Sequence, residues 1–139
     1  MKKLFVAFAS VLVFVGCASA QLKQKFTLQG DHGKLSAVLQ TPKNKKDYPL
    51  VIIAHGFNAS KDMYLLTDLS QQLNKRGIAT LLFDFNGHGQ SEGSFLDMTI
   101  PNELQDARHV YAYVAKLPHV PKIPYMRGNT PAFGLKPRL

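Results

Sequence analysis

Cysteine is nearly absent from the chain, which has a single one, Cys17, among 139 residues. One thiol cannot form an intrachain disulfide, so the fold cannot depend on such a bond. The sequence also shows no internal repeat and no second domain. Its length is enough for one modest domain with a core, and its 45% hydrophobic content is that of a globular protein rather than a disordered one.

Residues 1–20 have the parts of a secretory signal peptide. Lys2 and Lys3 come first, an apolar stretch runs from Leu4 to Val15, and the small-residue triplet "ASA" ends the segment. The apolar stretch is too short to span a membrane comfortably. We therefore expect cleavage after residue 20 and export to the periplasm or the extracellular space. A rival interpretation is a lipoprotein box, "FVGC", with a lipid on Cys17 that anchors the chain to a membrane; the Ala-x-Ala cleavage site is the better match.

Acidic residues are scarce, and the formal charge is +8. Without Lys2 and Lys3, 15 basic residues stand against 9 acidic ones, a formal charge of +6. The excess lies in an expected turn near residues 43–46 and in a final segment, 121–139, that has no acid at all. No basic helix and no interleaved aromatic pattern accompanies it, so the sequence predicts no nucleic-acid partner.

Hydrophobic periodicity predicts an α/β fold. Two alternating strands, 23–30 and 34–41, flank the turn "DHG" as a hairpin. The apolar runs "PLVIIAH" (49–55) and "IATLLFDF" (78–85) are typical of parallel strands buried on both faces. A helix should follow each run, the first from an N-cap at Ser60 to a stop at Gly77 and the second over 101–117. The apolar stripe of the first helix is expected at Met63, Leu65, Leu66, Leu69 and Leu73.

The predicted sheet is an antiparallel hairpin followed by parallel strands with right-handed crossover helices, and it is incomplete. A further strand should begin near Lys122, but Pro124 removes a backbone donor from its middle. We therefore expect a partial domain over 21–120 and an irregular, proline-rich basic tail over 121–139, which a shifted reading frame would explain.

Two motifs, taken together and in the order in which they occur, resemble the N-terminal part of the α/β-hydrolase family. The resemblance is to its feruloyl-esterase-like and serine-aminopeptidase-like lipase branch in particular. The motifs are "VIIAHGF" before a helix and "LLFDFNGHGQSEG" before a second helix, and the resemblance covers most of 26–117. It implies Ser-His-Asp hydrolysis of a small-molecule carboxylic ester, without a cofactor. It also implies that the backbone N–H of Phe57 belongs to the oxyanion hole, with His55 and Gly56 forming the turn before it. The plainer alternative is that His55 and Gly56 merely end a strand.

Ser91 lies in "GQSEG", which matches the G-x-S-x-G pattern of a serine nucleophile. A nucleophile elbow is a sharp strand-to-helix turn, whereas Ser91 is six residues beyond Phe85 and precedes "GSFLDMT". The resemblance also makes this loop a structural turn. Possible partners at 103, 106 and 109 are spaced three apart on one predicted helix, where we expect a surface row. We therefore predict that Ser91 is structural.

The nucleophile of the resembling family should follow the strand near residue 122, where the chain reads "KIPYMRGNTPAFG" and has no serine. Thr130 could stand in its place, but threonine is stiff and Pro131 lacks the N–H that completes an oxyanion hole. We therefore assign no catalytic residue and predict an N-terminal hydrolase fragment that lacks activity. A non-catalytic binding or interaction protein on the same scaffold is the alternative.

Three residues with possible metal ligands alternate in one loop, namely Asp84, Asn86 and His88. No further histidine, cysteine or carboxylate pattern completes them, so the sequence predicts no metal site. We expect His88 to hydrogen-bond within the glycine-rich turn instead.

Overall fold

An antiparallel hairpin begins the fold in the computed structural model, which describes residues 21–43 and 46–120. Strands β1 (Gln21–Gln29) and β2 (Lys34–Pro42) pair along their whole length. The turn between them is closed by a bond from Gly30 N–H to the Gly33 carbonyl, 2.8 Å long. Gly33 has φ 139°, a left-handed conformation that favours glycine. The hairpin predicted around "DHG" is thus confirmed.

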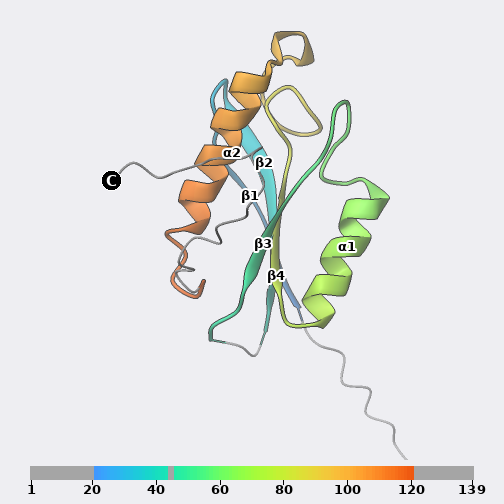
Figure 1. The fold of residues 1–139 in the computed structure, drawn as a ribbon, viewed down its shortest axis with the longest axis vertical. Coiled ribbons are helices and arrows are strands. Elements are labelled where there is room, and N and C mark those ends of the chain that lie inside the picture. Colours follow the sequence, from blue (N-terminus) through green and yellow to red (C-terminus); the bar gives the residue numbers. More distant parts are fainter. Residues whose placement is uncertain (1–20, 44–45, 121–139) are drawn as a thin grey trace, which may run out of the picture.

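A parallel pair of strands with helices on either side completes the described chain (Figure 1). The elements are β3 (Leu50–Ala54), α1 (Tyr64–Lys75), β4 (Ala79–Phe83), the short 3-10 helix η1 (Phe95–Asp97) and α2 (Ile100–Val114). The strand order is β1-β2-β4-β3, in which β4 is antiparallel to β2 and parallel to β3. The predicted mixed sheet with a crossover helix is therefore confirmed.

Burial differs sharply between the two parallel strands. All five residues of β4 are buried, as its continuous apolar run predicted. In β3 only Ile53 is buried, and Val51 is 39% exposed, because β3 lies at the edge of the described sheet. The prediction of burial on both faces is wrong for β3 in this part of the chain. The register pairs Ala54 with Phe83, so the two strands end side by side.

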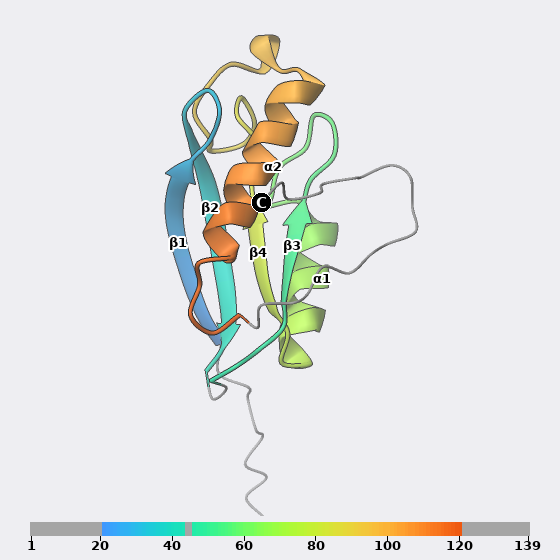
Figure 2. The same cartoon turned by 60° about the vertical axis from the view of Figure 1, so that its left-hand side comes forward.

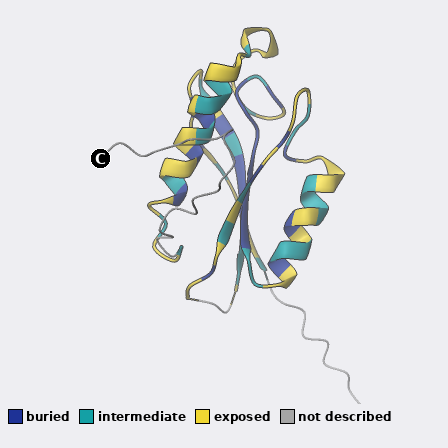
Figure 3. Ribbon diagram, in the orientation of Figure 1, coloured by how far each residue is buried: buried dark blue, intermediate teal, exposed yellow. Residues whose placement is uncertain are grey.

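The helices cover opposite faces of the sheet, as the turned view in Figure 2 also shows. The main core lies under α2, where Val110 and Val114 pack against residues of β2 and β4 such as Leu35, Leu81 and Phe83. In Figure 3 the dark, buried residues gather in the central strands β2 and β4, between helices whose outer faces are exposed. Among the described residues, no helix combines the length and the apolarity that a membrane span needs.

The start and the buried face of α1 differ from the sequence prediction. The helix begins at Tyr64 after the cap residue Met63, not after Ser60. Its buried residues are Ser70 and Asn74, whereas most of the predicted apolar stripe lies outside, with Leu65 69% and Leu69 45% exposed. The reason is a polar contact with the sheet: Ser70 Oγ lies 2.6 Å from Thr80 Oγ1, and Asn74 Nδ2 donates to the Ile78 carbonyl. The predicted stop at Gly77 is confirmed by its φ of 77°.

Candidate functional site

The ends of β3 and β4 bring two loops together at one edge of the sheet. Residues 55–61 follow β3 and are called here the His-Gly-Phe loop, and residues 84–95 follow β4 and are called the glycine-rich loop. The carboxyl ends of parallel strands are where open α/β sheets commonly place ligands. The site predicted by sequence therefore lies where this fold class offers one.

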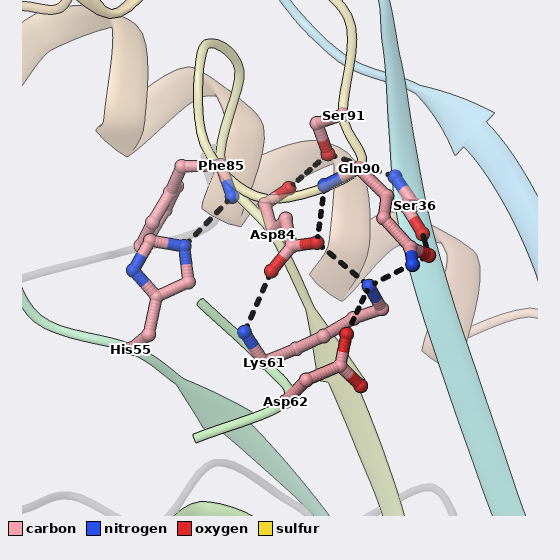
Figure 4. Close-up of polar contacts among 8 residues, drawn as sticks. All are labelled: Ser36, His55, Lys61, Asp62, Asp84, Phe85, Gln90 and Ser91. Atoms are coloured by element: carbon pink, nitrogen blue, oxygen red, sulfur yellow. Dashed lines mark hydrogen bonds and ion pairs between the residues drawn. The ribbon is translucent and has the colours of Figure 1, made fainter. Parts of the chain in front are cut away.

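His55 joins the two loops through its ring nitrogen Nε2, which accepts a bond from Phe85 (Figure 4). The N–H of Phe85 donates to His55 Nε2 over 3.1 Å, and His55 Nδ1 lies 2.8 Å from the Gly56 carbonyl. A backbone N–H can only donate, so Nε2 carries the lone pair and Nδ1 carries the proton. The ring is buried, 6% exposed, and packs edge-on against the Phe85 ring. His55 thus extends the contact between β3 and β4 beyond their last paired residues.

Asp84 makes the second connection between the loops, and sequence reasoning considered it only as a metal ligand. Its fully buried carboxylate accepts the Lys61 backbone N–H at 2.6 Å, the Lys61 ammonium at 2.7 Å and the Gln90 N–H at 2.9 Å. Lys61 was not singled out in the sequence at all. Its partner is 23 residues away, so no local pattern indicates the pair.

Phe57 lies between these two connections. Its side chain is 75% exposed, with the ring centroid 5.6 Å from that of Phe95. Its backbone N–H has no hydrogen-bond partner within the described part of the chain. The turn itself is made by Asn58, which has φ 51°, a left-handed value that asparagine tolerates better than most residues.

The backbone at Gly56 does not require a glycine. Gly56 is not among the residues of positive φ, and a Cβ atom at this position would meet nothing within 4 Å. The tight turn therefore does not need a glycine here. Among the described residues, only the chain neighbours of Gly56 could lie within 4 Å of such a Cβ atom.

Ser91 is held by the backbone of two strands' ends. Its hydroxyl donates to the Asp84 carbonyl at 2.6 Å and accepts the Ser36 N–H at 2.8 Å. The bond with Asp84 lies within the glycine-rich loop, and the bond with Ser36 joins this loop to β2, continuing the contact that β4 makes with the same strand. This geometry agrees with the structural interpretation of Ser91.

Asp106 corrects the expected surface row on the second helix. It is 1% exposed, and its carboxylate accepts the N–H of Asp31 and the N–H of Asn86, each at 2.8 Å. It therefore ties the hairpin turn and the glycine-rich loop to α2. His109 is exposed, so these residues do not share one surface.

The three alternating residues of the suspected metal pattern have protein partners instead. Asp84 binds Lys61, Asn86 Oδ1 accepts the His32 N–H at 2.8 Å, and His88 Nδ1 lies 3.1 Å from the Asn86 carbonyl. The predicted bond of His88 within the turn is confirmed. Across residues 21–43 and 46–120, no cluster of three or more potential metal-binding side chains is found. Cys17 and Thr130 lie outside the described residues.

Comparisons with known proteins show which proteins the chain is similar to. A family model described as serine aminopeptidase, S33, matches residues 45–124. The chain is 33% identical over 73 residues to a polyketide transferase of Stachybotrys chlorohalonatus, a match that covers 52% of this chain and 24% of that protein. It is 33% identical over 87 residues to a quorum-quenching protein of Acinetobacter baumannii, which covers 60% of this chain and 28% of that protein.

A solved structure is also similar to this one. It is Est1E from Butyrivibrio proteoclasticus with ferulic acid bound, at 38% identity and a TM-score of 0.66, over 68% of this chain and 39% of that chain. The chain spans about a quarter of the length of the two curated relatives, 24% and 28%.

Proposed function

The chain belongs to the serine aminopeptidase S33 family of α/β-hydrolases, and we propose that it forms the N-terminal part of an exported carboxylic ester hydrolase. Hydrolysis is the chemistry of the family. The ester substrate is proposed because Est1E binds ferulic acid, a carboxylic acid of the kind that ester hydrolysis releases. Export is proposed from the leader at 1–20. The substrate is a small molecule, and the chemistry needs no cofactor.

The observation that carries this proposal is that the Phe57 N–H has no hydrogen-bond partner in residues 21–43 and 46–120. Attack on an ester carbonyl places a negative charge on its oxygen, and prearranged N–H donors lower the barrier by binding that oxygen in the transition state. Among the described residues the Phe57 N–H has no partner, although both ends of its loop are hydrogen-bonded to the end of β4. We assign it as one donor of the oxyanion hole. Gly56, the residue before it, has no side chain that could stand in the way of a substrate.

This polypeptide alone is proposed to have negligible esterase activity. The hydroxyl of Ser91 is bonded to backbone groups, and the stretch expected to hold the nucleophile reads "KIPYMRGNTPAFG". The test is hydrolysis of p-nitrophenyl acetate by the purified chain, with labelling by a fluorophosphonate probe as a second readout. We expect neither to exceed background. Turnover or labelling that is lost in Ser91→Ala or Thr130→Ala would overturn this part of the proposal.

The substrate class has a separate test in the coding sequence. Reading the gene from the codon of Lys116 in all three forward frames shows whether another frame encodes G-x-S-x-G followed by an acid and a histidine. The protein restored in that frame should cleave p-nitrophenyl esters. If the restored protein cleaves aminoacyl p-nitroanilides and not the esters, the proposed substrate class is wrong and the substrate is a peptide.

A further inference from the structure

Lys61 and Asp84 form an ion pair that has no part in the chemistry proposed above, yet both side chains are buried. Lys61 is 3% and Asp84 0% exposed, and Nζ lies 2.7 Å from Oδ2. Moving two charges out of water is costly, and apolar residues of similar size often give an equal or greater stability. A gain in stability is therefore a weak explanation of this pair. The geometry that the pair imposes is a better explanation.

The Asp84 carboxylate uses each oxygen for a different purpose. Oδ1 accepts the backbone N–H of Lys61, while Oδ2 accepts the Lys61 ammonium and the N–H of Gln90. Gly89, at φ 50°, passes so close that a Cβ there would clash with this carboxylate. The carboxylate is thus enclosed on both sides and holds the end of the His-Gly-Phe loop at a defined place.

The two connections of this loop reach neighbouring residues. Its first residue, His55, accepts the N–H of Phe85, and its last, Lys61, binds Asp84. Between them the N–H groups of 56–60 have no partner among the described residues, and Phe57 and Asn58 are exposed. The direction of the Phe57 N–H therefore depends on the two ends of its loop.

The ammonium of Lys61 has three N–H groups and donates to three acceptors. Besides Asp84 Oδ2 it binds Asp62 Oδ2 at 3.2 Å and Gln90 Oε1 at 3.2 Å (Figure 4). These partners come from the start of the segment before α1 and from the glycine-rich loop. One side chain thus holds both loops at once, and its removal leaves the bond from the Lys61 backbone N–H to Asp84 Oδ1 as the remaining contact with Asp84 at that end.

We propose that the Lys61–Asp84 ion pair is the positioning device of the oxyanion donor: it fixes the carboxyl end of the His-Gly-Phe loop so that the Phe57 N–H keeps one direction. The inference rests on the role proposed for Phe57, because a loop without that role needs no fixed direction. Lys61 and Asp84 are positioning residues, since neither is placed to touch a substrate.

The test measures the order of the loop and does not depend on catalysis. Backbone ¹⁵N relaxation is recorded on the purified chain expressed from its full coding sequence, as wild type, Lys61→Met and Lys61→Arg. Lys75→Met is the matched control, because Lys75 is exposed in the last turn of α1. In the wild type and the control, the order parameter of Phe57 should match the rigid backbone value of about 0.85. In Lys61→Met it should fall below about 0.6, while the strands stay rigid.

Lys61→Arg keeps the charge, and it should restore much of the order. A wild-type Phe57 that is already flexible would overturn the proposal, and so would an unchanged order parameter in Lys61→Met. Loss of order in the sheet and loop together, including failure to fold, would assign the pair to general stability and overturn it too. If the loop behaves as expected but the restored protein cleaves no ester, the positioning role stands and the ester proposal falls.

Discussion

Replacing Ser91 by alanine tests whether its hydroxyl is structural or is a nucleophile. The hydroxyl donates to the Asp84 carbonyl and accepts the Ser36 N–H, at 2.6 and 2.8 Å. Alanine removes both bonds and leaves a partly buried N–H without an acceptor. The bond from the Ser91 N–H to the His88 carbonyl is unaffected, because it belongs to the backbone.

The expected loss follows from these two bonds. A buried polar group left without its partner costs about 1–3 kcal/mol, so we expect Ser91→Ala to lower the free energy of unfolding by about 2 kcal/mol. For a domain of this size each kcal/mol lowers Tm by about 4–8 °C, which makes a shift of about 8–16 °C. Thermal and urea unfolding followed by circular dichroism measure both quantities.

Ser60→Ala is the matched control, because the Ser60 hydroxyl has no hydrogen bond within the part of the chain that the structure describes. Its free energy of unfolding should stay within about 0.5 kcal/mol of the wild type. If the two variants melt together, the hydroxyl of Ser91 does not hold the loops, and the structural argument against its being a nucleophile fails.

Two further predictions concern glycine and tyrosine. Gly89→Ala should be strongly destabilised, because φ is 50° and the new Cβ would meet the Asp84 carboxylate. The free energy of unfolding of Gly56→Ala should stay within about 0.5 kcal/mol of the wild type. Equal urea midpoints for the two variants would contradict the geometry of both sites. Burial raises the pKa of Tyr48 above its usual 10.0, because the folded state favours the neutral phenol. The contribution of this group to the free energy of unfolding is therefore fully present below pH 10 and is lost as the pH rises further. Tyr48→Phe should therefore lose less stability than the wild type between about pH 9 and 11 in urea titrations, and parallel losses would show that Tyr48 is not the group responsible.

The elements that the sequence predicted well are those with a strong local pattern. β4 is a continuous apolar run with a central place in the sheet, and Gly77 ends α1 because it adopts the left-handed conformation expected of a stop. The buried face of α1 could not be predicted in this way. Ser70 turns inward because Thr80, on another element, offers a partner, and periodicity records apolar residues rather than such pairs.

The sequence predicted where the His-Gly-Phe loop lies, after β3, but not which residues hold it there. The motif around Phe57 predicted a functional loop, and the structure places that loop at the carboxyl end of β3. Asp106 was expected on a surface, yet two backbone N–H groups from distant turns make its burial acceptable. Lys61 carries no sequence signal, because its meaning depends on a carboxylate 23 residues away.

The anchoring of the His-Gly-Phe loop also bears on how homologous sequences should diverge. Positions 61 and 84 share one buried contact, so a lineage that loses the lysine should lose the carboxylate with it, and the two should change as a pair. Phe57 contributes a backbone group, and its side chain is 75% exposed, so many residue types should be acceptable there. Evolutionary constraint should therefore be stronger on Lys61 and Asp84, which hold the loop, than on Phe57, which contributes the proposed oxyanion donor.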